Sequence, residues 1–206
     1  ALMSRELILH HPDIRHFTTV WMDSLRGGES MLVNTNKLIR FYDGATGLKT
    51  GSTGSAGYCL SATAEKNGME LIAVVLKGKT SDERFSDAKS LLNYGFSTWS
   101  LVTVTPDEVL PPVPVTLGVR GTVQPVLTSE NTLLVEKTLA NGLTKEVALA
   151  ESVAAPVYAG DTLGQLTVRD AAGNTVAELP ILAGEDVGHV TFVLMLVRCV
   201  ARGFCM

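Results

Sequence analysis

An Asn-Gly pair between two apolar runs constrains the fold of this chain more than any other feature of its sequence. Asn67-Gly68 separates residues 58–64 from residues 69–76. Such a pair between apolar runs is the strongest short-range signal for a hairpin with a two-residue turn. The second run is almost continuously apolar, which is typical of a strand that is covered on both faces. We therefore expect an antiparallel hairpin inside a layered domain.

A helix that would cover this hairpin is predicted directly after it. Residues 80–83 read Thr-Ser-Asp-Glu, a hydroxyl cap followed by acids in the first turn. Apolar residues then recur at helical spacing, and Gly95 is expected to end the helix. The apolar residues are Phe85, Ala88, Leu91, Leu92 and Phe96. Hairpin and helix together predict an α+β domain.

The residues that precede the hairpin give less regular patterns. Residues 2–9 have helical spacing, and this helix should stop before Pro12 because the residue before a proline avoids the helical region. Residues 17–21 are a candidate for a short strand. The asparagines in residues 30–39 suggest local turns rather than a regular element.

Composition and the spacing of metal-binding residue types argue against several classes of protein. The net charge is −4, the sequence pI is near 5.6 and basic residues do not cluster, so nucleic acid is not an expected partner. The three cysteines include no Cys-x-x-Cys pair, which supports neither a disulfide framework nor a zinc site. We interpret the crowded His10, His11, Asp13 and His16 as solvated loop residues. No metal or cofactor is therefore predicted.

A proline-rich stretch marks a domain boundary. Four prolines fall within residues 105–114, so the first domain is assigned to residues 1–100. Short apolar runs separated by turn residues follow, and they predict a small all-β sandwich or barrel over residues 101–187. The expected strands are residues 115–119, 122–126, 132–136, 163–168 and 175–179.

Residues 188–206 are assigned to a C-terminal amphipathic helix. Residues 190–204 are almost wholly apolar, and Arg198 and Arg202 lie four apart and would share one helix face. At about 17 residues the segment is short for a spanning helix, which needs roughly 20. We expect an anchor that lies in the plane of a membrane surface, while a C-terminal core helix stays open as the alternative.

Residues 42–54 contain the candidate functional residues. If this segment is a strand, Lys49, Gly51 and Thr53 share one face. Lysine and threonine would supply the fixed charge and the hydroxyl donors that a terminal carboxylate needs. Gly51 leaves room for a substrate backbone, and the N–H of Ser52 could serve an oxyanion. A glycine-rich surface turn with a solvated lysine is the alternative.

Four stretches of the chain, in the family's order, resemble the serine-type D-Ala-D-Ala carboxypeptidases, which are the low-molecular-mass penicillin-binding proteins. The stretches are residues 32–38, residues 43–53 with Lys49-Thr50-Gly51, residues 56–58 and residues 83–96. The resemblance implies the C-terminal part of a penicillin-binding, β-lactamase-like catalytic domain with an antiparallel sheet plus helices. In that family a small β-rich domain and a C-terminal amphipathic anchor follow the catalytic domain.

The resemblance also implies a function and a location. The implied reaction is serine acyl-enzyme hydrolysis, which removes the terminal D-alanine of peptidoglycan stem peptides. The implied location is the cell envelope, at the extracytoplasmic face of the cytoplasmic membrane. β-Lactams would inhibit the full-length protein, and no cofactor is implied.

The resemblance assigns roles to single residues. Lys49, Thr50 and Gly51 would form the catalytic Lys-Thr-Gly element. Lys49, Thr50 and Thr53 would bind the terminal carboxylate of the substrate, and the backbone N–H of Ser52 would complete the oxyanion hole. Arg84 matches a family arginine, although a surface charge on the closing helix is an open alternative.

One departure from the family pattern concerns the nucleophile. Family catalysis needs Ser-x-x-Lys and Ser-x-Asn ahead of the Lys-Thr-Gly strand, and residues 1–48 contain neither motif. Matches at residues 86–89 and 129–131 come later in the chain, and we interpret both as non-catalytic. We therefore expect a truncated form that is inactive alone. A class A β-lactamase-like hydrolase and a non-catalytic, membrane-associated envelope module stay open as alternatives.

Overall fold

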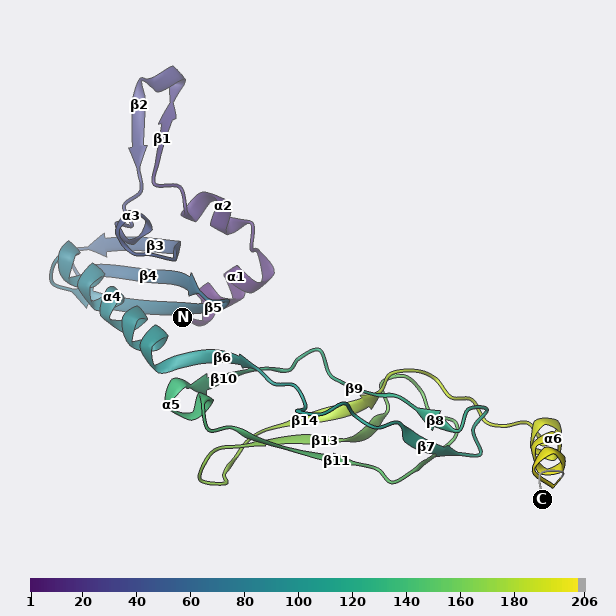
Figure 1. The fold of residues 1–206 in the computed structure, drawn as a ribbon. Coiled ribbons are helices and arrows are strands. Elements are labelled where there is room, and N and C mark those ends of the chain that lie inside the picture. Colours follow the sequence, from purple (N-terminus) through teal and green to yellow (C-terminus); the bar gives the residue numbers. More distant parts are fainter. Residues whose placement is uncertain (204–206) are drawn as a thin grey trace. The chain divides into compact units, whose positions relative to one another are not determined.

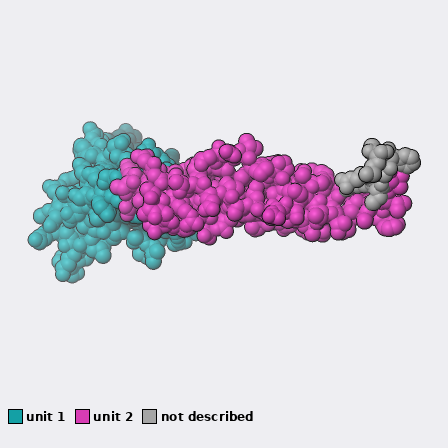
Figure 2. Space-filling model, turned by 60° about the horizontal axis from the view of Figure 1, so that its bottom comes forward, with its two compact units in different colours: residues 1–101 teal, residues 102–206 magenta. Residues whose placement is uncertain are grey.

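The computed structural model describes residues 1–203, and the chain divides into two compact units (Figure 1; Figure 2). Unit 1 comprises residues 1–101, and unit 2 starts at residue 102. Helices and strands are mixed in unit 1, whereas strands predominate in unit 2. The predicted α+β class is confirmed.

Unit 1 is built from helices on a central sheet and from a second hairpin. Its elements are α1 (Leu2–His10), α2 (Ile14–Thr18), β1 (Met22–Leu25), the 3-10 helix η1 (Arg26–Gly28), β2 (Ser30–Val33), α3 (Leu38–Phe41), β3 (Ala45–Thr53), β4 (Gly57–Lys66), β5 (Met69–Gly78) and α4 (Ser81–Thr98).

The central sheet has the order β3-β4-β5 and is antiparallel throughout. β4 and β5 join at the predicted turn, where Lys66 pairs with Met69 and the φ angles of Asn67 and Gly68 are 52° and 76°. Asparagine and glycine tolerate positive φ better than other residues, which is why this pair directs the chain into a tight hairpin. The hairpin prediction is confirmed.

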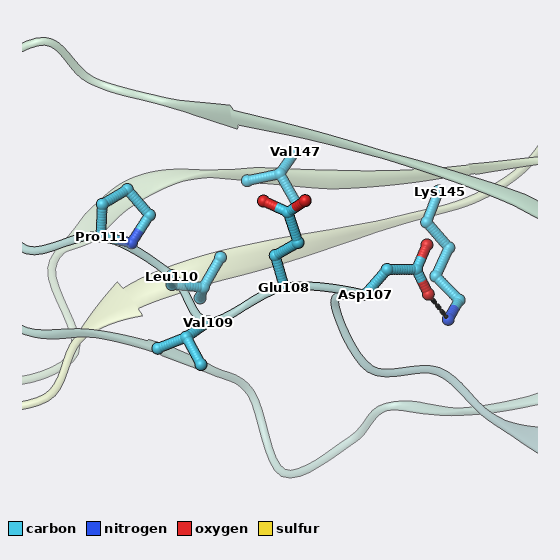
Figure 3. Close-up of a pocket in the computed structure, with 7 residues that line it drawn as sticks. All are labelled: Asp107, Glu108, Val109, Leu110, Pro111, Lys145 and Val147. Carbon is cyan, nitrogen blue, oxygen red and sulfur yellow. Dashed lines mark hydrogen bonds and ion pairs between the residues drawn. The ribbon is translucent and has the colours of Figure 1, made fainter.

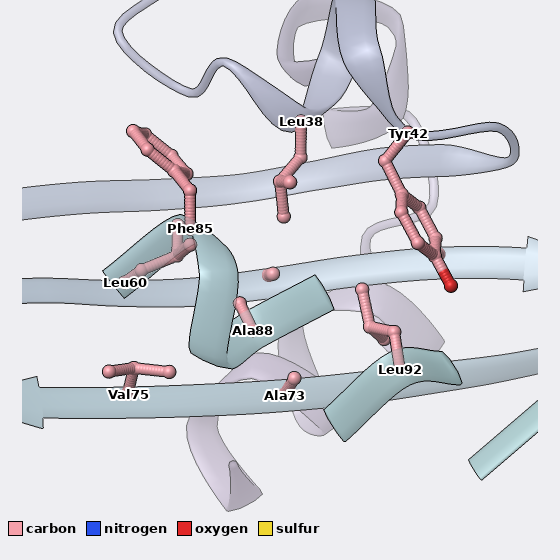
Figure 4. Close-up of a cluster of buried hydrophobic side chains, with 10 residues drawn as sticks. Leu38, Tyr42, Leu60, Ala73, Val75, Phe85, Ala88 and Leu92 are labelled. Carbon is pink, nitrogen blue, oxygen red and sulfur yellow. The ribbon is translucent and has the colours of Figure 1, made fainter. Parts of the chain in front are cut away.

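Helix α4 covers one face of this sheet, and the contact forms the core of unit 1 (Figure 4). The core residues are Leu38, Tyr42, Leu60, Ala62, Ala64, Ala73, Val75, Phe85, Ala88 and Leu92. Thr80 caps the helix as predicted, because its Oγ1 accepts a hydrogen bond from Glu83 N at 3.1 Å. The prediction that Gly95 ends the helix is wrong. A Cβ at this position would collide with Leu71 Cδ1, so Gly95 allows close packing inside a helix that continues to Thr98.

Helix α1 lies against the opposite face of the sheet. Ser61 follows Leu60 along β4 and therefore points away from α4. Its Oγ is 2.8 Å from Ser4 Oγ on α1. Both faces of the central sheet therefore contact a helix, as the apolar second arm of the hairpin predicts.

The strand expected at residues 17–21 is absent, which corrects the prediction. Helix α2 ends at Thr18, and strand β1 starts only at Met22, which pairs with Val33 of β2. β1 forms only because it pairs with residues 30–33 of β2. Those residues were predicted to be irregular, so the prediction did not provide a partner for this strand.

The rest of the chain is rich in strands and contains two short helices. Its elements are β6 (Trp99–Thr103), β7 (Val113–Thr116), β8 (Thr122–Val123), β9 (Pro125–Leu127), β10 (Thr132–Glu136), α5 (Lys137–Ala140), β11 (Thr144–Leu149), β12 (Val153–Ala154), β13 (Thr162–Arg169), β14 (Thr175–Ala183) and α6 (Phe192–Gly203). The sheets have the orders β11-β13-β14-β9, β12-β7-β8 and β10-β6.

Unit 2 has two hydrophobic clusters between its strands. One contains Val113, Val115, Val123, Val157, Leu163, Ala183 and Val187. The other contains Val104, Leu166, Val168, Leu179 and Ile181. Because none of these residues belongs to the core of unit 1, each unit has a core of its own.

Several strands of unit 2 differ from the prediction. The strand expected at residues 115–119 is β7 at Val113–Thr116, the strand expected at 122–126 is divided into β8 and β9, and β12 was not expected. β11 was not expected, because at the edge of its sheet most of its side chains are exposed and its sequence does not alternate. β14 runs to Ala183 rather than ending at residue 179. It passes through Pro180, which is tolerated because β9 pairs with β14 only at Ile181–Ala183.

Helix α6 falls within the segment that was predicted to be an amphipathic helix. Its side chains from Phe192 to Val197, and that of Val200, are exposed. Within residues 1–203, none of the helices combines the length and the apolar character that crossing a membrane requires.

Candidate functional site

Strand β3 holds the five predicted site residues in extended backbone. Lys49 pairs with Ser61, Thr50 with Leu60 and Gly51 with Cys59. β3 is the outermost strand of its sheet, so its outer edge has no strand partner within the described part of the chain. The segment is therefore a strand, and the glycine-rich turn that was the alternative is not formed.

Lys49 presents a positive charge at this edge. Its side chain is exposed, and its Nζ donates a hydrogen bond to the carbonyl oxygen of Thr50 at 2.5 Å. No acidic side chain among residues 1–203 forms a recorded ion pair with it. The ammonium group is therefore free to attract an anion.

The two threonines of the predicted site differ in their surroundings. Thr50 is 9 % exposed and lies on the face that packs toward α4, opposite to Lys49. Its Oγ1 is 2.6 Å from Thr35 Oγ1. Thr53 lies on the Lys49 face, and its Oγ1 accepts a hydrogen bond from Ala56 N at 3.0 Å in the turn to β4. The structure therefore does not bring the Lys49 and Thr50 side chains to one face of the strand.

The backbone at Gly51 and Ser52 is accessible. A Cβ added to Gly51 would meet no atom within 4 Å, so packing inside the chain does not require glycine there. Gly47 is different, because a Cβ there would lie 3.1 Å from the hydroxyls of Thr18 and Thr63. Ser52 is exposed. The open space at Gly51 is what an approaching ligand backbone would need.

Arg84 is a buried residue whose surroundings the sequence did not define. It is 7 % exposed, so the interpretation as a surface charge is wrong. Its Nη1 donates to the carbonyl oxygens of Gly51 at 3.3 Å and Cys59 at 3.2 Å, which ties α4 to paired positions of β3 and β4. Arg84 lies four and eight residues before Ala88 and Leu92, and this helical spacing could have predicted its burial.

The segment Asn34-Thr35-Asn36 is another part of the site that the sequence did not assign. Asn34 Oδ1 accepts from Asn36 N at 2.9 Å, which is a local turn of the predicted kind. The buried Asn36 donates its Nδ2 to the carbonyl oxygen of Gly47 at 2.8 Å. This turn is thereby fixed beside β3.

The groups with shifted pKa values lie outside this site. Burial, and secondarily the charge of Asp43, raises the pKa of Tyr42, whose hydroxyl donates to Oδ1 of the exposed Asn93. Hydrogen bonds from Asn174 lower the pKa of the exposed Asp170. Within residues 1–203, His, Cys, Asp and Glu do not gather in a group that could hold a metal ion.

A pocket of about 320 Å³ lies in unit 2 and includes none of the predicted site residues (Figure 3). It is lined by Asp107, Glu108, Val109, Leu110, Pro111, Lys145 and Val147. The Lys145 ammonium donates to Asp107 Oδ1 at 2.6 Å, so these two charges compensate each other.

Comparison with known families identifies both units. Residues 1–80 match the family model described as D-alanyl-D-alanine carboxypeptidase. Residues 102–189 match the model described as penicillin-binding protein 5, C-terminal domain. The two matches follow each other in the order that the sequence resemblance implies.

Similar proteins cover most of this chain. D-alanyl-D-alanine carboxypeptidase DacF of Bacillus subtilis is 34% identical over 203 residues, which are 96% of this chain and 52% of DacF. DacC of Escherichia coli is 30% identical over 143 residues, which are 68% of this chain and 36% of DacC. The crystal structure of penicillin binding protein 5 from Haemophilus influenzae shares the fold with a TM-score of 0.73, at 23% identity, over 92% of this chain and 55% of that one.

The chain spans about half the length of DacF and a smaller part of DacC. The two family matches and the identity to DacF agree with one another across both units. The chain therefore belongs to the D-alanyl-D-alanine carboxypeptidase family.

Proposed function

We propose that this chain forms one side of the active site of a peptidoglycan D-Ala-D-Ala carboxypeptidase, which removes the terminal D-alanine of stem peptides through a serine acyl-enzyme. The observation that carries the proposal is the open edge of β3, where an uncompensated lysine adjoins an accessible glycine. A peptide that ends in a carboxylate needs such a charge, and an extended peptide backbone needs such an edge.

Each residue of the strand has a proposed role. Lys49 attracts the terminal carboxylate, and Gly51 allows the peptide backbone to approach the strand. The backbone N–H of Ser52 stabilises the oxyanion that forms when the serine attacks the peptide carbonyl. Thr53, on the Lys49 face, supplies one hydroxyl group for the carboxylate, and Thr50, on the opposite face, supplies another across the open edge of β3. The hydroxyl of Thr53 would have to exchange its present bond to Ala56 for one to the ligand.

The nucleophile of this reaction does not come from the late motif matches. Ser86 and Lys89 are exposed on α4, which covers the face of the sheet opposite to Lys49. Residues 129–131 belong to unit 2, where Asn131 Nδ2 donates to the carbonyl oxygen of Val104. Both placements favour the interpretation that a serine outside residues 1–206 completes the site. Penicillin, which the relative from Haemophilus influenzae is named for binding, would acylate that serine, and other β-lactams would be expected to do the same.

The proposal predicts that a chimera will be active. Residues 1–206 replace the matching part of DacF, and the purified chimera is assayed for D-alanine release from an acyl-D-Ala-D-Ala peptide and for labelling by fluorescent penicillin. We expect D-alanine release and covalent labelling by the chimera, and no labelling of the 206-residue chain alone. DacF itself is the positive control, and thermal unfolding verifies that the chimera is folded.

Three results would contradict parts of this proposal. A folded chimera without D-alanine release would refute the carboxypeptidase assignment. Faster hydrolysis of penicillin than release of D-alanine would favour the β-lactamase-like alternative. Labelling of the 206-residue chain alone would show that one of its own serines, with Ser86 the first to be tested, is the nucleophile.

We also propose that residues 188–206 attach the protein to the extracytoplasmic face of the cytoplasmic membrane in the cell envelope. The support is the exposed apolar surface of α6, where Phe192, Val193 and Val197 are 79, 71 and 57 % exposed. An apolar helix surface of this kind is costly in water and is stabilised in the boundary between lipid headgroups and acyl chains.

This attachment is tested by co-sedimentation with liposomes that contain anionic lipid. We expect the 206-residue chain to pellet with the liposomes and a chain that ends at residue 187 to stay in the supernatant. A variant with Val193→Asp and Val197→Asp, which keeps the length of the helix, should lose binding as well. Equal binding by the full and the shortened chain would remove the proposed anchor.

A further inference from the structure

A threonine outside the Lys-Thr-Gly strand contacts the hydroxyl of that strand. Thr35 Oγ1 lies 2.6 Å from Thr50 Oγ1, and Thr35 is the partner recorded for this hydroxyl among the described residues. The two side chains differ in exposure, since Thr50 is 9 % exposed whereas Thr35 is exposed. The pair therefore connects a hydroxyl in the protein interior with one that reaches solvent beside β3.

The backbone on both sides of Thr35 is fixed. Asn34 Nδ2 donates to the carbonyl oxygens of Thr18 and Val20, and Asn36 Nδ2 donates to that of Gly47. Asn36 is 2 % exposed, so its bond to β3 is shielded from water. An exposed threonine in a free loop would rotate, but this one is held in place by its neighbours. These bonds fix the backbone at Thr35, and the contact with Thr50 holds its hydroxyl.

The hydroxyl protons of Thr35 and Thr50 determine which hydrogen bonds the pair can donate to a ligand. Each hydroxyl has one proton to donate, and the bond between the two uses one of these protons. When Thr35 is the donor of this bond, the second proton stays available on Thr50. A carboxylate near the edge of β3 would accept this proton, and the bond inside the pair would orient and polarise the donor.

We propose that Thr35 is a positioning residue, which orients the Thr50 hydroxyl and thereby confers selectivity for ligands that end in a carboxylate. The inference rests on the proposed function, in which Thr50 binds that group. Lys49 attracts any anion, because its charge has little directional preference. A hydroxyl group that donates in a fixed direction binds only a carboxylate in a defined position, and this adds geometric selectivity to the attraction by Lys49.

The test uses the 206-residue chain in a titration followed by amide NMR signals. The probes are N-acetyl-D-alanyl-D-alanine and the same dipeptide with a C-terminal amide. We expect the carboxylate form to shift the signals of residues 49–53 and to bind more tightly than the amide form. Thr35→Val should weaken binding of the carboxylate form about two- to tenfold, the effect of losing one hydrogen bond between neutral hydroxyls, and should leave the amide form unchanged. Thr35→Ser, which restores the hydroxyl, should recover the preference.

Unit 2 provides a matched control. Thr103 Oγ1 and Thr132 Oγ1 form a second threonine pair at 3.3 Å, far along the chain from the candidate site, so Thr132→Val should change neither affinity. The proposal is overturned if Thr35→Val leaves the carboxylate preference intact, if it weakens both probes equally, or if the starting chain shows no preference. Thr35→Ala is a second variant should Thr35→Val unfold on a thermal scan. Activity of the DacF chimera tests the proposed function separately, so the two can fail independently.

Discussion

Lys49→Ala is expected to lower kcat/KM for D-alanine release by the DacF chimera about 10- to 100-fold, the effect of losing a charged hydrogen bond to the substrate. The reason lies in the surroundings of Lys49, because its exposed ammonium has no acidic partner among the described residues. Alanine removes this charge without leaving an unpaired acid behind, so the loss reports on the ligand and not on a broken ion pair. The measurement is release of D-alanine over a range of peptide concentrations.

Two further variants make this prediction specific. Lys79→Ala removes an exposed lysine just ahead of α4, and we expect its kcat/KM to stay within about twofold of the unchanged chimera. Lys49→Arg keeps the charge but presents it in a planar fork, so partial activity is expected. If Lys49→Ala and Lys79→Ala have the same activity, Lys49 does not bind the carboxylate.

The sequence predicts those parts of the fold that local chemistry determines. Asn67-Gly68 requires positive φ at two positions, and Thr80 with its first-turn acids caps α4, so both elements could be located from a few residues. The strand at Met22 could not be located in this way. Its pairing with β2 is a contact between segments, and neither segment has a strong pattern of its own.

In the candidate site, too, local sequence predicts some features, whereas others depend on contacts between distant segments. The sequence left the conformation of residues 45–53 open between a strand and a glycine-rich turn, and the alternation of the side chains was predicted only for the strand, which the structure forms. The surroundings of Arg84 and Thr35 do not follow from the sequence, because each contacts β3 from a distant segment, across 33 and 15 positions. Short motifs identify the strand that faces a ligand, whereas the residues that support this strand depend on the tertiary fold.

Leu60→Ala and Leu166→Ala are each expected to destabilise one unit by about 2–5 kcal/mol and to leave the other unit unchanged. Leu60 is 1 % exposed in the core of unit 1, and Leu166 is 0 % exposed in a cluster of unit 2. Domains of this size are stable by only about 5–15 kcal/mol, so either change is large. Amide hydrogen exchange measures it, with Ala62 and Ala64 reporting on unit 1 and Val168 reporting on unit 2.

The physical basis of this prediction is that the two cores share no residue. A cavity left by Leu60 removes contacts among side chains of the β4 and α4 layer, and the surrounding atoms relax only partly into the space. Leu76→Ala is the matched control in unit 1, because Leu76 is 72 % exposed and its loss should cost less than about 0.5 kcal/mol. Equal loss of protection in both units after Leu60→Ala would show instead that they unfold as one cooperative body.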